Sequence, residues 1–348
     1  MLDTPPAPLA LDLDSAALRA NWRWLARQSG PAACGAAIKA NGYGLGAREV
    51  VRHLLAEGCR DFFVASWGEA AHVLPQLGEA SLSVLHGVRE EDMPFALASP
   101  ARPVLNSLDQ VARWKAAGGG PCDVMIDTGM NRLGLPPTQS SRALLSGLAI
   151  ETMMSHLACA DEESPMNGEQ LATFIGLSAG IDARRRSLAN SAGVCLGPDY
   201  HFDLTRPGLA LYGGIPRGEA SAYIAQVVRP RAQILQRRTV RGGETVGYGA
   251  TYTAHEDREL AILNLGYADG YLRGFSGKGL ALFEDLRLPL VGRVSMDLIA
   301  IDVTAAPHLR EGDWLEIAFD LPTAAARSGL SQYELLTGLG RRYERIWR

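Results

Sequence analysis

Residues 32–46 read Ala-Ala-Cys-Gly-Ala-Ala-Ile-Lys-Ala-Asn-Gly-Tyr-Gly-Leu-Gly. The first seven residues are small and apolar and predict a buried strand, and the glycines that follow Lys39 predict a turn. Burial removes hydration from a lysine and lowers its pKa, which makes the amine a nucleophile toward a carbonyl group. A surface lysine in a loop between a strand and a helix is the alternative interpretation, and residue types alone favour it.

The length and composition limit the classes of protein to which this chain can belong. A chain of 348 residues predicts two domains, and 47% hydrophobic residues supply a sizeable core. A net charge of −4 argues against a nucleic-acid or anionic-membrane partner. No segment approaches the roughly 20 apolar residues that span a bilayer, and the N-terminus shows no secretory signal.

The five cysteines are odd in number and scattered along the chain. No pair has the spacing of zinc ligands, so the sequence predicts neither a disulfide framework nor a metal site. We therefore expect a reducing, cytoplasmic compartment.

Short apolar runs alternate with amphipathic segments through the first two thirds of the chain. Eight strand candidates, most of them followed by a helix candidate, predict a (β/α)8 barrel over residues 15–224. The strand candidates are residues 32–38, 62–65, 82–86, 104–106, 123–127, 153–157, 187–190 and 202–204. In such a barrel the chemistry lies at the carboxyl ends of the strands.

The pattern changes near Ile224, where strands follow one another with short turns. This arrangement predicts a mostly antiparallel β domain over residues 225–348. The strand candidates are residues 227–237, 244–248, 259–265, 279–283, 288–294, 298–303 and 314–317, and residues 333–339 predict a late helix or turn. A short strand over residues 9–14 precedes the barrel and makes a poor first barrel strand.

Several polar clusters follow the predicted strands. Taken singly, each is compatible with an ordinary structural role, such as a hydrogen-bonded core His156 or an ion pair of Arg132 or Arg206. Together and in order they form a specific combination. The motifs are Ala-Ile-Lys-Ala-Asn-Gly-Tyr-Gly (37–44), Asp-Thr-Gly-Met-Asn-Arg-Leu-Gly (127–134), Arg-Pro-Gly-Leu-Ala-Leu-Tyr-Gly (206–213), Val-Gly-Tyr-Gly (246–249), Gly-Tyr-Ala-Asp-Gly (266–270) and Ser-Met-Asp (295–297).

This combination resembles the alanine racemases, amino-acid racemases of fold type III that depend on pyridoxal phosphate (PLP). The resemblance runs from Leu9 to the C-terminus. It implies that residues 1–14 contribute their strand to the β domain. It also implies interconversion of L- and D-alanine, for cell-wall synthesis or alanine catabolism, by a homodimer with shared active sites.

The resemblance assigns roles to individual residues. Lys39 matches the lysine that carries PLP covalently, and Tyr248 matches a second base that reaches the active site of the other subunit. The residues expected to bind the cofactor are Lys39, Tyr43, His156, Asn190, Ser191, Arg206, the backbone of Gly208 and Leu209, and Tyr343. Arg132 and the backbone of Met296 match the groups that hold the substrate carboxylate. Positions that line or support the entry route are Tyr267, Arg273, Arg293 and Asp297.

One departure from the family pattern concerns Arg132. Family members commonly carry a lysine, often carbamylated, two residues before the Asp-Thr-Gly motif, and this chain has Met125 there. A methionine supplies no negative charge, so a small anion or another carboxylate would have to orient Arg132.

Other functions remain open on the sequence. They are a serine or broad-specificity racemase, a PLP-dependent amino-acid decarboxylase of the same fold, a non-catalytic PLP-binding protein, and a structural barrel that keeps the motifs by descent. Decarboxylases of this fold usually place a cysteine at the partner-supplied catalytic position, and Val-Gly-Tyr-Gly argues against that function.

Overall fold

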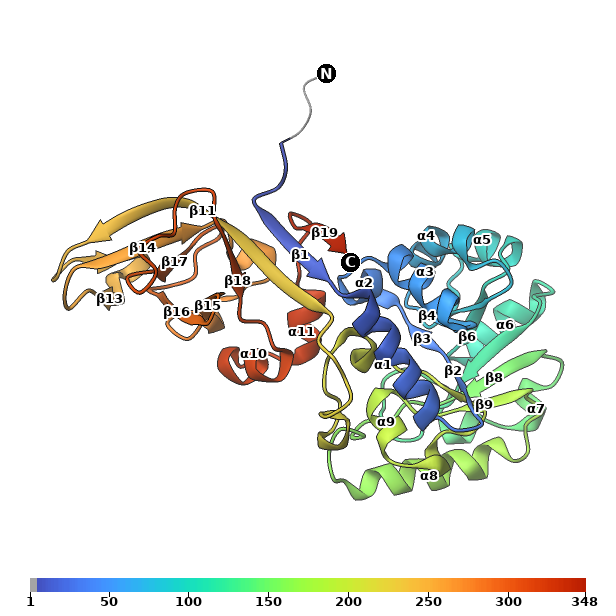
Figure 1. The fold of residues 1–348 in the computed structure, drawn as a ribbon. Helices are drawn as coiled ribbons and strands as arrows, with labels where there is room; N and C mark the ends of the chain where they lie inside the picture. The colour runs from blue at the N-terminus through green and yellow to red at the C-terminus, as the bar shows by residue number, and fades with distance from the viewer. Residues whose placement is uncertain (1–4) are drawn as a thin grey trace. The chain divides into compact units, whose positions relative to one another are not determined.

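The computed structural model describes residues 5–348, which form two compact units (Figure 1). One unit comprises the described residues up to Ala17 together with Gln226–Arg348, and the other comprises Leu18–Ala225. No helix among residues 5–348 is long and apolar enough to cross a membrane.

The Leu18–Ala225 unit is built on short parallel strands. Seven of them form one sheet in the order β3-β4-β5-β6-β7-β8-β9, and β10 pairs with β2. The strands are β2 (Ala33–Cys34), β3 (Ala36–Ala37), β4 (Asp61–Val64), β5 (Ser81–Val84), β6 (Arg102–Leu105), β7 (Cys122–Met125), β8 (Ile150–Met154), β9 (Arg185–Ser187) and β10 (Leu204–Thr205). Strands β2 and β3 are the two halves of one strand interrupted at Gly35.

Backbone hydrogen bonds close these strands into a barrel. On one edge of β10, the N–H of Ala37 donates to the carbonyl of Pro207 at 2.9 Å. On its other edge, the N–H of Arg206 donates to the carbonyl of Ala189 at 2.8 Å. The last strand therefore lies between β9 and the first strand, and the predicted (β/α)8 barrel is confirmed.

Helices cover the outer face of the barrel strands (Figure 1). Four of them begin after a serine whose hydroxyl accepts a backbone N–H of the first turn: Ser66, Ser107, Ser141 and Ser164. The helices are α1 (Ser15–Gln28), α3 (Ala47–Glu57), α4 (Trp67–Leu77), α5 (Met93–Ala98), α6 (Leu108–Ala116), α7 (Arg142–Leu145), α8 (Pro165–Ser178) and α9 (Ser191–Cys195). The segment labelled α2 (Lys39–Tyr43) is a left-handed turn.

The predicted strand over residues 202–204 begins later than expected. Phe202 has a φ of 51°, in the left-handed region that turns use, so extended backbone starts only at Leu204. The predicted strand over residues 153–157 is also displaced, because β8 begins at Ile150 and ends at Met154. These shifts move boundaries by a few residues and leave the strand order unchanged.

A layer of charged residues is buried inside the barrel. Arg185 donates to both oxygens of Asp61 at 2.6 and 3.0 Å. The carboxylate of Asp123 accepts from Ser83 at 2.5 Å and lies 3.4 Å from the guanidinium of Arg102. Burial raises the pKa of Asp123, while Arg102 acts in the opposite direction. Each buried carboxylate is thus paired with an arginine, as burial of a charge requires.

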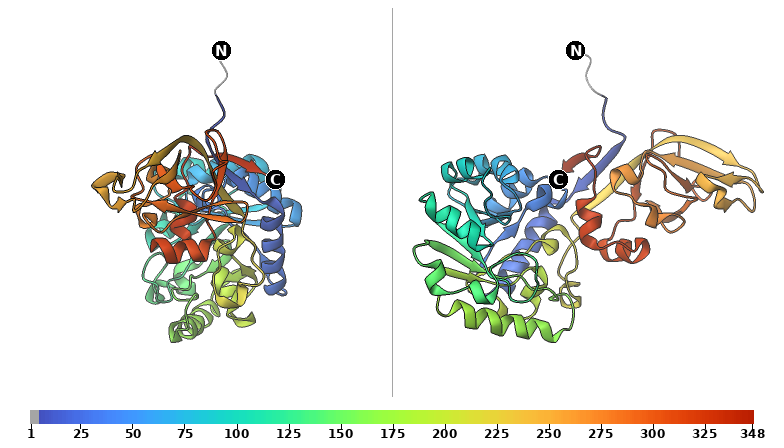
Figure 2. Two further views of the ribbon diagram at one scale, coloured as in Figure 1. Left: turned by 60° about the vertical axis from the view of Figure 1, so that its left-hand side comes forward. Right: turned by 180° about the vertical axis from the view of Figure 1, so that it is seen from behind.

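The second unit is a mostly antiparallel β domain (Figure 2). Its main sheet has the order β14-β17-β16-β15-β18-β11-β1-β19, and β14 pairs with β11 as well. The strands are β1 (Leu9–Leu13), β11 (Val228–Val240), β12 (Thr245–Val246), β13 (Tyr252–Thr253), β14 (Arg258–Leu263), β15 (Leu280–Phe283), β16 (Leu286–Val291), β17 (Ile299–Asp302), β18 (Trp314–Ile317) and β19 (Glu344–Trp347).

The first strand of the chain belongs to this β domain, as expected. Strand β1 runs antiparallel to β11, with Leu11 opposite Pro230, and parallel to β19, with Leu11 opposite Arg345. Strand β19 and helix α10 (Leu321–Ser328) are absent from the sequence prediction, whereas α11 (Gln332–Thr337) corresponds to the late helix.

A substitution at the interrupted barrel strand tests how tightly its backbone packs. A Cβ built on Gly35 would lie 2.8 Å from the carbonyl oxygen of Asp61 and 2.9 Å from the ring of Phe63. Because backbone cannot yield as a flexible side chain does, we expect Gly35→Ala to lower the free energy of unfolding by about 1–3 kcal/mol.

Chemical denaturation would measure this loss. Gly120→Ala is the matched control, because no heavy atom lies within 4 Å of a Cβ built there. Equal stabilities of the two variants would show that the barrel strand accommodates a side chain at residue 35.

Candidate active site

A left-handed turn follows Lys39 at the carboxyl end of the first barrel strand. The φ angles of Ala40, Asn41, Gly42 and Tyr43 are 52°, 55°, 63° and 51°. Each L-residue in this conformation costs roughly 1–2 kcal/mol. Within the turn, the N–H of Gly42 donates to the carbonyl of Ile38 at 2.8 Å. The Asn41 side chain accepts the N–H of Ala47 at 3.0 Å, so neighbouring structure compensates part of the strain.

The turn buries Tyr43 against another ring. Tyr43 stacks on Tyr212 with 4.6 Å between ring centroids, and the Tyr212 hydroxyl donates to the carbonyl of Ala37 at 2.9 Å. A Cβ built on Gly208 would overlap the Tyr43 hydroxyl. Only glycine at residue 208 therefore lets its backbone approach this tyrosine.

Backbone amides converge near the start of α9. The hydroxyl of Ser191 accepts the N–H of Gly208 at 2.9 Å and of Ala210 at 3.2 Å. Asn190 has a different task, because its side-chain oxygen accepts the N–H of Gly193 at 2.9 Å and caps α9. Ser191 thus engages the N–H groups of Gly208 and Ala210, and its own hydroxyl hydrogen is left to donate to an anion such as phosphate.

Arg206 is buried at 6% exposure and is held by neutral acceptors. Its guanidinium donates to the hydroxyl of Ser187 and to the carbonyl of Ser155, the latter at 2.5 Å. No carboxylate forms an ion pair with it in the described part of the chain. Burial lowers the pKa of Arg206 to about 10, and Asp123 partly offsets this effect, so Arg206 is cationic at neutral pH.

The groups around Lys39 are mostly cationic. Burial lowers the pKa of the Lys39 amine, Arg132 and Arg206 lower it further, and Glu69 opposes them. Burial, then Arg206, Lys39 and Arg132, lower the pKa of His156 to about 3. His156 is therefore a neutral imidazole at physiological pH. The structure thus brings Lys39, His156 and Arg206 together at one end of the barrel, as the sequence predicts.

Arg132 lies on a loop shaped by Asp127. One carboxylate oxygen of Asp127 accepts the N–H groups of Gly129 at 2.9 Å and Asn131 at 3.1 Å. Arg132 itself is exposed, and within residues 5–348 it has neither a hydrogen bond nor an ion pair. Met125, at the end of the preceding strand, is buried at 7% exposure.

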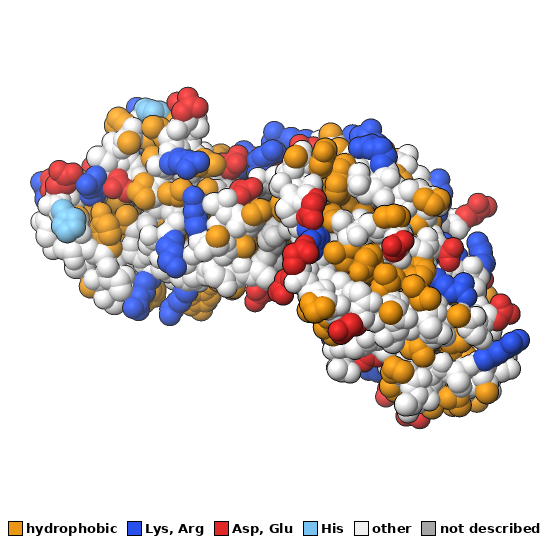
Figure 3. Space-filling view, turned by 90° about the horizontal axis from the view of Figure 1, so that it is seen from below, with side chains coloured by type: hydrophobic (Ala, Val, Ile, Leu, Met, Phe, Trp, Pro, Cys, Tyr) orange, Lys and Arg blue, Asp and Glu red, His pale blue; other side chains and the backbone are white. Residues whose placement is uncertain are grey.

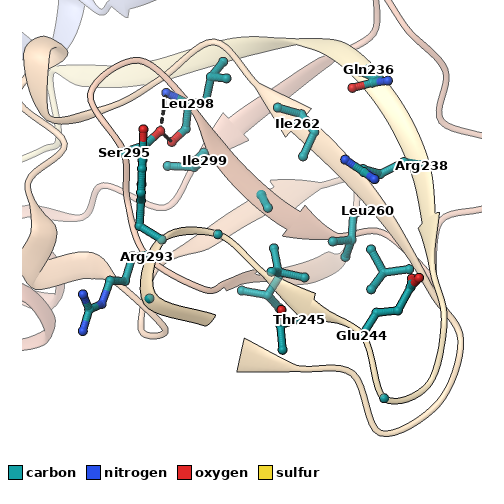
Figure 4. Close-up of a pocket in the computed structure, with 18 residues that line it drawn as sticks. Gln236, Arg238, Glu244, Thr245, Leu260, Ile262, Arg293, Ser295, Leu298 and Ile299 are labelled. Carbon is teal, nitrogen blue, oxygen red and sulfur yellow. Dashed lines mark hydrogen bonds between the residues drawn. The ribbon is translucent and has the colours of Figure 1, made fainter. Parts of the chain in front are cut away.

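In the β domain, Tyr248 lies on a glycine-flanked turn and is 67% exposed. The predicted strand over residues 244–248 stops at Val246, because Gly247 has a φ of 76°. Tyr248 and Arg293 border a hollow of about 1040 Å³ that Figure 4 shows in close-up. Its lining includes the apolar side chains of Leu260, Ile262, Leu298 and Ile299.

Arg342 joins the β-domain loops that carry the other predicted site residues. Its guanidinium donates to both oxygens of Asp269 at 2.6 and 2.7 Å and to Asp297 at 2.6 Å. The N–H of Ala268 donates to the carbonyl of Met296 at 3.0 Å. Nothing in the sequence pattern distinguishes Arg342 from its neighbours, so sequence reasoning missed it.

Three other predicted residues, Tyr267, Arg273 and Tyr343, also lie in the β domain. The guanidinium of Arg273 lies 5.5 Å from the ring centre of Tyr267, a cation–π arrangement. Tyr343 is buried at 5% exposure within the β domain.

The donor groups of the barrel unit fit PLP. An amine of lowered pKa suits a covalent link to the cofactor aldehyde, and Arg206 is a buried cation without a carboxylate partner. Ser191 and the backbone at Gly208 form a cradle that a larger residue at 208 would fill. Sequence reasoning missed Ser155 and Ser187, which orient Arg206, because nothing in their spacing indicates a shared partner.

Comparison with known proteins agrees with this geometry. Residues 13–216 match the model of the alanine racemase N-terminal domain, and residues 227–347 match that of the C-terminal domain. The alanine racemase of Rhodospirillum rubrum is 42% identical over 99% of this chain and 96% of its own length. Among solved structures, that of alanine racemase from Bartonella henselae with covalently bound pyridoxal phosphate has a TM-score of 0.91. It is 35% identical and covers 99% of this chain and 100% of its own. The chain belongs to the alanine racemase family.

Proposed function

We propose that this chain is a PLP-dependent racemase that interconverts L-alanine and D-alanine. The observation that carries this proposal is the position of Lys39 at the carboxyl end of the first barrel strand, in the electrostatic field of Arg206 on the last strand. The sequence contains two other lysines, Lys115 and Lys278, and both are exposed. Lys39 is thus the lysine suited to carry the cofactor.

The chain's own residues divide the work of holding the cofactor. PLP, when bound, withdraws electrons from the substrate and acidifies its Cα–H bond. Lys39 would carry the cofactor, Ser191, Tyr43 and the backbone at Gly208 and Leu209 would hold its phosphate, and Arg206 would face the ring nitrogen. Because Arg206 stays cationic, it disfavours protonation of that nitrogen. His156, being neutral, adds no charge beside the ring.

Racemisation requires a proton to leave one face of Cα and another to arrive on the opposite face. One base cannot easily serve both faces of a held substrate, so two are required. Lys39 serves the face from which D-alanine loses its proton. Tyr248 of a second subunit serves the other face, and Arg132 with the backbone of Met296 holds the substrate carboxylate.

A homodimer with shared sites follows from the assignment of Tyr248. This tyrosine is 67% exposed and has no hydrogen-bond partner in the described part of its own chain. The hollow beside it is lined in part by apolar side chains, of which Leu298 is 39% exposed. A second copy of the chain would cover this surface and receive the tyrosine. On the face drawn in Figure 3, acidic and basic side chains lie interspersed, which argues against a nucleic-acid partner.

The metabolic role of this chain is either biosynthetic or catabolic, and relatives of both kinds are similar to it. Agrobacterium fabrum has a biosynthetic alanine racemase 40% identical to this chain and a catabolic one 41% identical. Identity therefore does not separate D-alanine supply for the cell wall from alanine breakdown. A cytoplasmic location remains part of the proposal.

The first prediction from the proposed function concerns activity and substrate range. We expect the purified protein to contain PLP and to racemise alanine faster than any other member of a panel of L-amino acids. Serine would be slower by roughly 10–200-fold, because one extra hydroxyl in a small pocket changes discrimination by about 1–3 kcal/mol. Preference for a large or charged amino acid would overturn the substrate assignment, and release of carbon dioxide would indicate the decarboxylase.

Variants of the three lysines complete this test. Lys39→Ala should lose the visible absorbance of the lysine-linked cofactor and nearly all racemisation. Lys115→Ala and Lys278→Ala are matched controls and should retain both. A borohydride-reducible link to another lysine in Lys39→Ala would refute the assignment.

The second prediction tests the shared site. Lys39→Ala and Tyr248→Phe homodimers should each be inactive, and mixing them should yield heterodimers in which one of the two sites is intact. We expect recovery of activity after subunit exchange verified by mass spectrometry. Tyr252→Phe is the control and should be active alone. If exchange is complete and no activity returns, Tyr248 does not act across subunits.

The third prediction concerns Arg132 and Met125. Methionine cannot form a carbamate, so removal of bicarbonate and carbon dioxide should leave the racemisation rate unchanged. We expect a small anion beside Arg132, which crystals soaked in bromide would reveal by anomalous scattering. A carboxylate of a second subunit bonded to Arg132 would replace this explanation.

A further inference from the structure

Glu69 makes hydrogen bonds that its sequence context does not predict. Ser66 and Glu69 are spaced as a capping box, in which the glutamate would accept the N–H of Ser66. In the structure, Oε1 of Glu69 instead accepts the N–H of Ala40 at 2.6 Å, and Oε2 accepts the N–H of Ala65 at 2.7 Å. One carboxylate at the start of α4 thus joins the chain segments that follow β3 and β4.

Ala40 is the first residue of the left-handed turn and the direct neighbour of Lys39. Backbone in this region persists only where surrounding contacts determine it. The hydrogen bonds within the turn begin at later residues, such as Gly42, which donates to Ile38. Glu69 supplies a charged acceptor to the amide where the turn begins, and such hydrogen bonds are short and strong.

The charges that face the Lys39 amine come from four elements. Arg132 lies on the loop after β7, His156 follows β8, Arg206 follows β10, and Glu69 belongs to α4. The two arginines lower the pKa of the Lys39 amine, His156 is neutral, and Glu69 raises that pKa. Within residues 5–348 no carboxylate forms an ion pair with Lys39, because both oxygens of Glu69 accept backbone amides.

We propose that Glu69 is a positioning residue for Lys39, an inference that rests on the proposed racemase function. Its carboxylate fixes the left-handed turn, so that the Lys39 side chain leaves the backbone in one direction and meets one face of the substrate. The same carboxylate places a negative charge near the amine but forms no ion pair with it. A direct ion pair would hold the amine away from the reacting carbon.

Glutamine cannot reproduce this arrangement. Both partners of Glu69 are N–H donors, and a glutamine side chain offers one oxygen acceptor and one NH₂ donor. In Glu69→Gln one of the two backbone amides would therefore face another donor. Glu49→Gln is the matched control, because Glu49 occupies the first turn of α3 and, among residues 5–348, accepts hydrogen bonds from the exposed Arg52 alone.

The rates of racemisation from L-alanine and from D-alanine cannot by themselves show whether the change acts on Lys39. L- and D-alanine are mirror images of equal free energy, so kcat/KM must change equally in both directions. Primary isotope effects are not subject to this constraint. The isotope effect measured with each deuterated enantiomer reports on the base that removes the hydrogen from that enantiomer. For Glu69→Gln holoenzyme we expect a fall in kcat of roughly tenfold. The isotope effect should be larger with D-[2-²H]alanine and unchanged with L-[2-²H]alanine.

A spectroscopic titration gives a readout that does not depend on turnover. The visible absorbance of the lysine-linked cofactor in Glu69→Gln should titrate at lower pH than in the unmodified protein, because a nearby negative charge is lost. Glu49→Gln should show neither the isotope effect nor the spectral shift. Should Glu69→Gln fail to fold, Glu69→Asp keeps the charge on a shorter side chain. It should show the isotope effect with little spectral shift.

The outcomes separate this inference from the proposed function. If the unmodified protein shows no racemisation and no lysine-linked cofactor, the proposed function fails. If it shows both, and Glu69→Gln behaves like Glu49→Gln, only the role of Glu69 is refuted. Isotope effects that change equally in both directions, with an unshifted titration, would also refute it and indicate a general structural role.

Discussion

The hydrogen bonds between the first and last strands of the barrel determine where chemistry is possible in this chain. Ala37 donates to Pro207 two residues before Lys39 and one residue after Arg206. A single backbone contact thus makes neighbours of two segments that lie at opposite ends of the barrel sequence. Because carboxyl ends of barrel strands share one face, the side chains that follow these strands meet there. The contact that closes the barrel therefore also brings these two segments of the candidate site together.

Closure also creates an electrostatic problem. It brings cationic side chains close together, and the protein limits the repulsion in three ways. His156 loses its proton, the Lys39 amine has a lowered pKa, and Arg206 is bound by the neutral oxygens of Ser155 and Ser187. A buried arginine without a carboxylate partner is costly unless its donors are satisfied. The positive charge that remains at this end of the barrel favours binding of an anionic group.

Much of this arrangement could be predicted from the sequence. The alternation of apolar runs and helices predicts the barrel, and the motifs place Lys39, His156 and Arg206 at strand ends, where the structure has them. The errors in the predicted strand boundaries lie where the backbone departs from a regular strand. The first strand is interrupted at Gly35, where a side chain would meet the backbone of Asp61, and Phe202 adopts a left-handed conformation before β10. The contact at Gly35 involves a residue that is distant in sequence.

The residues that sequence reasoning missed share one property: each holds another polar group through a contact between segments that are distant in sequence. In the sequence, Ser155 and Ser187 are ordinary serines near strand ends. In the structure, both accept hydrogen bonds from Arg206. Glu69 is misleading in a different way, because its local pattern predicts a capping box and so explains it without reference to Lys39. The Ser66–Glu69 spacing is explained by helix capping, so the sequence gives no reason to expect the contact of Glu69 with Ala40. Such residues are found by asking which donors a carboxylate accepts in the folded chain, since hydrogen-bond partners, unlike sequence spacing, record the neighbours that folding creates.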